Sequence, residues 1–391
     1  MKVALYTYNT KPRGGVVHTL ALAEALVGQG CAVTVYALGH GGSERFYREV
    51  RADTTVFPFP AIDGEAFEAK IERSVQAFAA ALAGEPLGSF DVHHVQDCIS
   101  ANSLHRLQEK GLVPSFLRTV HHLDDFTTPA LVECQRRSVV APRELIVVSD
   151  TWRDILRRET GRDPAVIHNG VDERFFRPPD DVGADDGFTL PGRVVLFTLG
   201  GIEPRKNTIA TLHAFAKVKA QVPEAELVIG GGATLFDYRP YRAAFDEALE
   251  RLPPPARDAV RIVSSPDDAA VRRLYRRADV YLQPSLKEGW GLSVLEAMAS
   301  GTPVVASDIP VFREFMTDGS NALLADPADP DDIASAVLRV LADGALRERI
   351  AANGVRTAQA YTWPAAAERH LDVYRRGLDD ERAARIGGTY R

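Results

Sequence analysis

Residues 2–38 have the sequence KVALYTYNTKPRGGVVHTLALAEALVGQGCAVTVYAL, and this stretch decides the fold. The apolar run at 3–8 predicts a strand, residues 9–15 a loop, the residues up to about Val27 a helix, and 32–38 a second strand. A strand, a helix and another strand in this order are typical of a unit with parallel strands.

The same alternation continues along the chain, and it restarts after residue 192. Further strands are predicted at 90–95, 115–121, 144–149, 194–199, 225–229, 260–263, 280–283 and 304–306. Helices are predicted at 67–82, 208–222, 267–277, 292–300, 331–342, 345–360 and 363–376. The sequence therefore predicts an α/β fold with two doubly wound, Rossmann-like domains.

A break between the two series of strands indicates where the domains separate. Residues 177–192, RPPDDVGADDGFTLPG, are rich in Pro, Gly and Asp and have no periodicity, so we expect a linker there. The first domain then covers 1–176 and the second 193–360, with 361–391 forming a C-terminal helix and tail. In doubly wound sheets ligands bind at the carboxyl ends of the strands, so we expect the site in the cleft between the domains.

Composition excludes several classes of protein. The 391 residues are 45% hydrophobic and 25% charged, which is typical of a globular protein. The net charge of −7 gives no reason to expect a nucleic-acid partner. The three cysteines have no zinc-like spacing, and neither a signal peptide nor an apolar run of about 18 residues is evident, so we expect a cytoplasmic protein.

Several catalytic motifs are missing from the sequence. There is no GxxxxGK[ST], which disfavours a P-loop NTPase, and no GxGxxG after a strand, which disfavours a dinucleotide dehydrogenase. GxSxG and HExxH are also absent, so a nucleophile-elbow hydrolase and a zincin find no support.

The pair Gly14-Gly15 lies between the first predicted strand and the first helix. Adjacent glycines let the backbone approach a ligand closely, and the following helix directs free N–H groups to that point. The pair therefore suits a phosphate, although a tight turn without a ligand has the same sequence.

The pair Arg205-Lys206 follows the first strand of the second domain. Two cations at a strand's carboxyl end suit a diphosphate, and they oppose the dipole of the next helix. A solvated charged turn is the structural alternative.

The stretch EGWGLSVLE, residues 288–296, is the strongest signal. Gly291 permits a tight turn into a helix, and this turn leaves N–H groups free at the start of the helix. Eight helical residues would separate Glu288 from Glu296 by about 12 Å, a span that fits the two ends of a nucleotide sugar. Two ordinary exposed glutamates would give the same spacing.

Histidines mark the end of the strand predicted at 115–121. His121 and His122 would face the cleft, where packing, capping and catalysis are all open roles. The later segment HNGVD, residues 168–172, is predicted to be a structural Asn-Gly turn.

In this order, these features resemble family 4 of the retaining glycosyltransferases, which has the GT-B fold of two Rossmann-like domains facing across a cleft. The resemblance extends from Met1 to about Tyr374, and it is most specific in EGWGLSVLEAMASGTPVVASD, residues 288–308. It implies a hexosyltransferase whose C-terminal helix, beginning at Trp363, crosses back to the first domain.

The resemblance also implies roles for individual residues. Glu288 would bind the hydroxyls of the donor sugar, Glu296 would hold the ribose, and His121 would lie beside the reacting carbon. The diphosphate would be bound by the remaining candidates, namely Gly14, Gly15, Arg205, Lys206, Gly291 and Leu292.

One position departs from the family. Members usually have an arginine where this chain has Gly201, within the segment GGIEPRK at 200–206. We expect Arg205 to take its place, and we expect no metal because Arg205 and Lys206 supply positive charge.

The expected reaction is transfer of a sugar from a nucleotide sugar, UDP- or GDP-linked, to a hydroxyl of a glycan, a glycolipid or a small metabolite. The alternatives are a nucleotide-sugar-binding protein without catalysis, which Gly201 favours, and a phosphorylase or epimerase on the same scaffold. Peripheral contact with the inner membrane face also stays open, although no basic patch supports it. The sequence does not determine the oligomeric state.

Overall fold

The computed structural model describes residues 1–172, 176, 193–231 and 238–387, so the expected linker at 177–192 lies outside the described residues. The chain forms two compact units. The first contains Met1–Gly170 together with Trp363–Arg391, and the second contains Val171–Thr362. Within the described ranges, no helix is both long and apolar enough to cross a membrane.

The first unit is built on a parallel sheet of seven strands in the order β3-β2-β1-β4-β5-β6-β7. At its centre, Tyr6 of β1 pairs with Tyr36 of β2 and with Val95 of β4. Residues Val3–Tyr6 are fully buried, as expected for a strand covered on both faces. The strands are β1 (Lys2–Thr7), β2 (Ala32–His40), β3 (Asp53–Phe59), β4 (Val92–Val95), β5 (Leu117–Val120), β6 (Glu144–Val147) and β7 (Ala165–Val166).

Helices connect these strands and complete the first unit. They are α1 (Gly14–Gly28), α2 (Phe67–Leu82), α3 (Cys98–Glu109), α4 (Pro129–Val140), α5 (Asp150–Thr160) and the C-terminal α14 (Trp363–Gly387). Helix α1 begins at Gly14, so the glycine pair forms the first helical turn and not the loop that its sequence predicts. The strand β3 was also missed, because its half-exposed side chains hide the apolar pattern of an edge strand.

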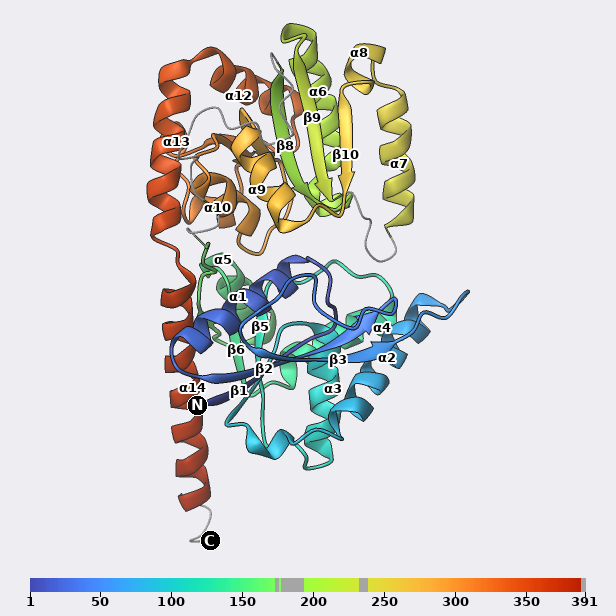
Figure 1. The fold of residues 1–391 in the computed structure, drawn as a ribbon, viewed down its shortest axis with the longest axis vertical. Helices are drawn as coiled ribbons and strands as arrows, with labels where there is room; N and C mark the ends of the chain where they lie inside the picture. The colour runs from blue at the N-terminus through green and yellow to red at the C-terminus, as the bar shows by residue number, and fades with distance from the viewer. Residues whose placement is uncertain (173–175, 177–192, 232–237, 388–391) are drawn as a thin grey trace. The chain divides into compact units, whose positions relative to one another are not determined.

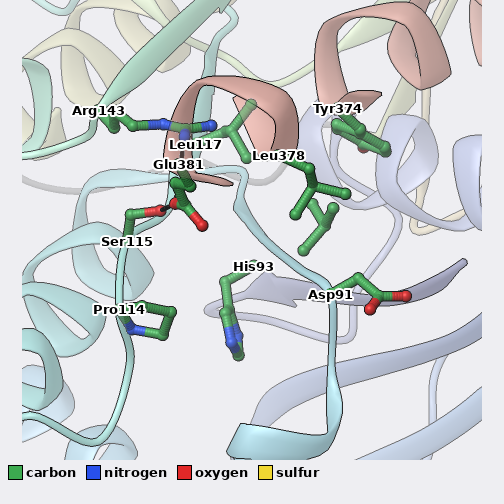
Figure 2. Close-up of a pocket in the computed structure, with 10 residues that line it drawn as sticks. Asp91, His93, Pro114, Ser115, Leu117, Arg143, Tyr374, Leu378 and Glu381 are labelled. Carbon is green, nitrogen blue, oxygen red and sulfur yellow. Dashed lines mark hydrogen bonds and ion pairs between the residues drawn. The ribbon is translucent and has the colours of Figure 1, made fainter. Parts of the chain in front are cut away.

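Helix α14 packs on the first unit, for example where the Tyr374 hydroxyl lies 2.7 Å from His94 Nδ1, and it continues about eleven residues beyond the predicted end. The Arg143 guanidinium packs against the backbone of α14 at Gly377. That guanidinium donates to the Gly377 carbonyl at 2.5 Å and pairs with Glu381 at 3.1 Å. Figure 2 shows Arg143 and Glu381 lining a small polar cavity at the amino ends of β4 and β5, the sheet edge opposite to ligand-binding ends.

The second unit repeats the design with six parallel strands in the order β10-β9-β8-β11-β12-β13. Figure 1 shows β8, β9 and β10 as neighbouring arrows. The strands are β8 (Val194–Gly200), β9 (Ala225–Gly231), β10 (Val260–Ser264), β11 (Val280–Gln283), β12 (Val304–Ser307) and β13 (Leu323–Ala325). The short β13 has no counterpart in the sequence prediction.

Helices complete the second unit. They are α6 (Thr208–Gln221), α7 (Arg239–Glu250), α8 (Pro254–Arg257), α9 (Asp268–Arg277), α10 (Leu292–Ala299), α11 (Pro310–Arg313), α12 (Pro330–Ala342) and α13 (Gly344–Gln359). Of these, α6, α7, α8, α12 and α13 contribute to one of the unit's apolar clusters. Sequence patterns missed α7, α8 and α11, of which α8 and α11 are single turns that begin at proline.

Candidate active site

The strand order of the second unit reverses between β8 and β11, so the crevice beyond their carboxyl ends is the place where a ligand is expected. After β8, a short 3₁₀ turn at Pro204–Lys206 carries both predicted cations. Asn207 ends that turn in the left-handed conformation, with φ of 56°. Its side-chain amide donates to the carbonyls of Pro284 at 3.0 Å and Pro327 at 2.7 Å, which anchors the turn to neighbouring loops.

The loop after β11 brings Glu288 into direct contact with these cations. Lys206 Nζ lies 2.6 Å from Glu288 Oε1, and Arg205 Nη1 lies 3.4 Å from Oε2. Glu288 is only 8% exposed, and burial alone would raise the pKa of its carboxyl. Burial is outweighed by Lys206 and Arg205, which together with the hydrogen bonds lower that pKa to about 2. The carboxylate is therefore charged at neutral pH.

Two polar residues, Gln283 at the end of β11 and Ser285 in the loop after it, support Glu288, and sequence reasoning missed both. Gln283 Nε2 donates to Glu288 Oε1 at 3.0 Å, and Ser285 Oγ donates to the same oxygen at 2.8 Å. Gln283 is held in turn by the Tyr281 hydroxyl at 2.6 Å. Both residues are close to Glu288 in the sequence, and this proximity was the available signal. The sequence does not show, however, toward which neighbour a polar side chain points.

Glu203 is a third residue that sequence reasoning missed. It is relevant to Gly201, the position at which this chain lacks the arginine that is usual in the family. Glu203 is 3% exposed, and its carboxylate lies 3.3 Å from Arg205 Nε. Arg205 is thus held between Glu203 and Glu288 at the carboxyl end of β8. A cation therefore occupies the strand end where Gly201 offers no side chain.

Gly291 adopts a φ of +114°, a conformation that favours glycine. A Cβ atom there would also lie 2.7 Å from the Phe312 ring, so no other residue fits without rearrangement. This turn starts α10 at Leu292 and leaves the first-turn N–H groups at the carboxyl side of the sheet.

Glu296 lies in α10, and only the residues from Leu292 onward are helical. The expected spacing of eight helical residues between the two glutamates is therefore wrong, because Glu288–Gly291 form a loop. The half-buried Glu296 accepts a hydrogen bond from the Tyr275 hydroxyl at 2.9 Å. Burial raises the pKa of its carboxyl to about 8, and no cation of the described residues offsets this effect as Lys206 does for Glu288.

In the first unit, the structure brings Gly15 and His121 together. A Cβ atom on Gly15 would lie 3.7 Å from the His121 ring, which follows β5 as predicted. Burial is the main reason that the pKa of His121 falls to about 3, so its imidazole is neutral.

His18, one turn along α1, is a residue that sequence reasoning missed. Its buried ring lies 4.7 Å from the ring of His121 and 6.1 Å from that of His370 in α14. His18 Nδ1 lies 2.8 Å from Asn169 Oδ1. The Asn-Gly turn, which the sequence predicts to be structural, therefore also holds the imidazole of His18 in place. Sequence gave no signal for this cluster, because its members come from segments that are far apart.

Two doubly wound parallel units with paired cations and carboxylates at a strand-order reversal define a glycosyltransferase of the GT-B class. Family models agree: residues 188–357 match "Glycosyl transferases group 1" and residues 12–175 match "Glycosyltransferase Family 4". The chain therefore belongs to glycosyltransferase family 4, which confirms the family, the fold class and the type of enzyme that the sequence predicts.

Relatives and solved structures agree with this assignment. The chain is 32% identical to phosphatidyl-myo-inositol mannosyltransferase of Mycolicibacterium smegmatis, over 73% of this chain and 71% of that protein. It is 28% identical to D-inositol 3-phosphate glycosyltransferase of a Nocardioides species, over 98% and 91%. Sucrose-phosphate synthase of Thermosynechococcus elongatus shares the fold, with a TM-score of 0.80, 23% identity, and coverage of 97% of this chain and 100% of that one.

Proposed function

We propose that this glycosyltransferase moves a sugar, with retention of configuration, from a UDP- or GDP-sugar to a hydroxyl of a phosphorylated inositol. The observation that carries the donor half is the group of Arg205, Lys206 and Glu288 at the carboxyl ends of β8 and β11. The acceptor class is supported by two relatives whose names specify inositol phosphate and phosphatidyl-inositol.

The proposed roles follow from charge. As the bond between the anomeric carbon and the diphosphate breaks, negative charge grows on the departing phosphate, and Arg205, Lys206 and the first turn of α10 stabilise it. Glu288 binds hydroxyls of the donor sugar, and Glu296 binds the ribose. Gly14 and Gly15 let the α1 backbone approach the donor. These groups supply the positive charge, so we propose that transfer needs no metal.

The proposed substitution takes place on one face of the sugar. The acceptor oxygen bonds to the anomeric carbon on the side from which the diphosphate leaves, and the acceptor proton passes to a phosphate oxygen. No protein nucleophile is required, and the neutral His121 contacts the donor sugar beside the reacting carbon. The enzyme acts in the cytoplasm, and a lipid-linked acceptor would bring it to a membrane surface.

The test is a donor screen followed by product analysis. UDP, GDP and their sugars are first ranked by thermal shift, because a donor stabilises the folded state by mass action. The donor that binds is then incubated with myo-inositol 1-phosphate, with and without EDTA, and the anomeric configuration of the product is read by NMR.

The outcomes of this test separate the alternatives. A product with the donor's configuration supports the proposal, and an inverted product overturns retention. Binding of a sugar donor without turnover of any acceptor supports the non-catalytic binding protein that Gly201 favours. Sugar phosphate formed from free phosphate identifies a phosphorylase, and a rearranged donor identifies an epimerase.

A further inference from the structure

The carboxyl edge of the first sheet carries buried polar atoms that have no hydrogen-bond partner among the described residues. They belong to side chains that follow, or end, four adjacent strands of the order β2-β1-β4-β5. These atoms are His40 Nε2, Thr10 Oγ1, Gln96 Nε2 and Oε1, and His121 Nε2. Because the strands are parallel, all four side chains lie at the edge where ligands bind in such sheets.

Gln96 is the strongest of these observations. The residue is 3% exposed, and neither its amide nitrogen nor its amide oxygen has a partner within the part of the chain that the structure describes. Leaving a buried polar group unpaired costs about 1–3 kcal/mol, so folded proteins rarely keep one. The nearby buried amide of Asn102 shows the usual arrangement, because it donates to the carbonyls of Cys98 at 2.7 Å and Cys134 at 2.8 Å.

Thr10 adds a hydroxyl to this edge. It is 1% exposed, and the turn that holds it is fixed by Asn9 Oδ1, which accepts from the N–H groups of Thr10 at 2.7 Å and Lys11 at 3.1 Å. An amide offers one donor group and one acceptor, and a hydroxyl offers both. Neighbouring hydroxyls of a polyol would satisfy these groups, since each hydroxyl can also donate and accept.

Positive charge lies beside the same edge. The His40 ring lies 5.9 Å from the Tyr8 ring, and the Tyr8 hydroxyl accepts from the Arg13 guanidinium at 3.1 Å. Helix α2 brings Lys70 to this edge, because the neighbouring Ile71 packs in one apolar cluster with Tyr8. Burial lowers the pKa of His40 to about 4, and Lys70 and Arg13 contribute to this shift. Among the described residues, no carboxylate forms an ion pair with Lys11, Arg13 or Lys70, so this charge is available to an anionic group.

We propose that Gln96 and Thr10 bind adjacent hydroxyls of the acceptor, and that Arg13 and Lys70 bind an anionic substituent of the same molecule. This inference rests on the proposed function, because it assigns the acceptor to this edge of the first unit.

The first experiment measures stability and acceptor binding in Gln96→Met, a variant of similar side-chain volume. We expect its melting temperature to equal or exceed that of the parent, because an unpaired buried amide is removed. We expect its affinity for myo-inositol 1-phosphate, measured by calorimetry without donor, to fall at least tenfold. The matched control is Asn102→Leu, which removes a paired amide and should lower the melting temperature.

The second experiment tests the charge. Lys70→Met and Arg13→Met should each weaken binding of myo-inositol 1-phosphate severalfold and leave binding of uncharged myo-inositol unchanged. Vesicles that contain phosphatidylinositol distinguish a lipid headgroup from a free monophosphate as the source of the same chemistry.

Two results would overturn the inference. One is a Gln96→Met variant with parental affinity, and the other is a parent protein that binds no inositol probe. Neither result touches the donor half of the proposed function, because nucleoside diphosphate binding is measured separately in the same proteins. Conversely, failure of every nucleotide to bind would defeat the proposed function and leave the binding data at Gln96 intact.

Discussion

The two sheets have the same strand order around the reversal point, but the hydrogen bonding of the polar side chains at their carboxyl edges differs. In the second unit, Gln283, Ser285 and Glu288 bond to one another, and Lys206 completes the group. In the first unit, Gln96 is buried with both amide atoms unpaired among the described residues. From this difference we infer that the second edge is organised before its ligand arrives, whereas the first is completed by one.

The two units also differ in the charge state of their buried titratable side chains. Nine of the ten histidines belong to the first unit, since His213 is the only histidine within 171–362. Burial lowers the pKa of His121 to about 3 and of His370 to about 4, so the cluster is neutral. The second unit instead buries charges and compensates them, as the pairing of Glu288 with Lys206 shows. Substitutions that disrupt these two arrangements should therefore have different measurable effects.

The largest effect is expected from Glu288→Gln. The variant removes the charge that pairs with Lys206 and the proposed acceptor for sugar hydroxyls, so kcat should fall by about 10²–10³. Affinity for the nucleoside diphosphate should be kept or increased, because the cations lose a competing carboxylate. Initial rates and calorimetry measure the two quantities. Glu226→Gln is the matched control, because Glu226 is also buried and pairs with Arg261 at 3.1 Å on another strand.

A parallel loss of diphosphate affinity in Glu288→Gln would contradict this assignment. It would mean that Glu288 mainly organises the cations, and that the second edge has no separate sugar-binding function.

Arg205→Ala should lower kcat by about 10- to 100-fold, since the charge on the leaving group grows in the transition state. Adding Gly201→Arg to this variant should restore part of the rate, if both positions reach the same phosphate. Arg261→Ala provides a control for loss of an arginine elsewhere in the unit. A single Arg205→Ala variant that transfers sugar at the parental rate would reduce Arg205 to a residue of the turn.

Buried histidines should make the first unit sensitive to acid. The pKa values of His93 and His370 are about 4 in the folded protein, against about 6.5 when unfolded, so the unfolded chain binds more protons between these values. The free energy of unfolding should therefore rise with pH across this window, and each such histidine contributes up to about 3 kcal/mol that is lost as pH falls from 6.5 to 4. Urea unfolding from pH 4.5 to 7.5 measures the slope.

His370→Phe should reduce that slope by up to about one proton. An unaltered slope in His370→Phe would show that His370 is not the source of the acid sensitivity.

The smallest effect is expected at Glu296. Ribose hydroxyls donate to a charged carboxylate better than to a protonated one, and the pKa of Glu296 is about 8. Affinity for the nucleoside diphosphate should therefore fall as pH is lowered from 9 to 7, by less than about tenfold per pH unit. Glu296→Gln should bind more weakly and lose this dependence. Tyr275→Phe should move the dependence to higher pH, because the Tyr275 hydroxyl bond lowers this pKa. Identical pH profiles in all three proteins would exclude Glu296 from the ribose site.

The order of strands and helices, the two-unit organisation and the family can all be predicted from the sequence. These follow from local periodicity, from apolar strands such as Val3–Tyr6, and from the single stretch 288–308, all of which operate over short distances along the chain. Local periodicity was weakest where a strand is half exposed, as in β3, and at the end of the C-terminal helix, which continues to Gly387.

Only the tertiary structure decided which polar groups are paired. His94 meets Tyr374 at 2.7 Å across 280 residues of sequence, and Lys206 meets Glu288 across 82. No spacing rule encodes such contacts, because they depend on which strands are neighbours and on how deeply each side chain is buried. Lys206 keeps the buried Glu288 charged, whereas burial raises the pKa of Glu296 and leaves Gln96 without a partner in the described part of the chain.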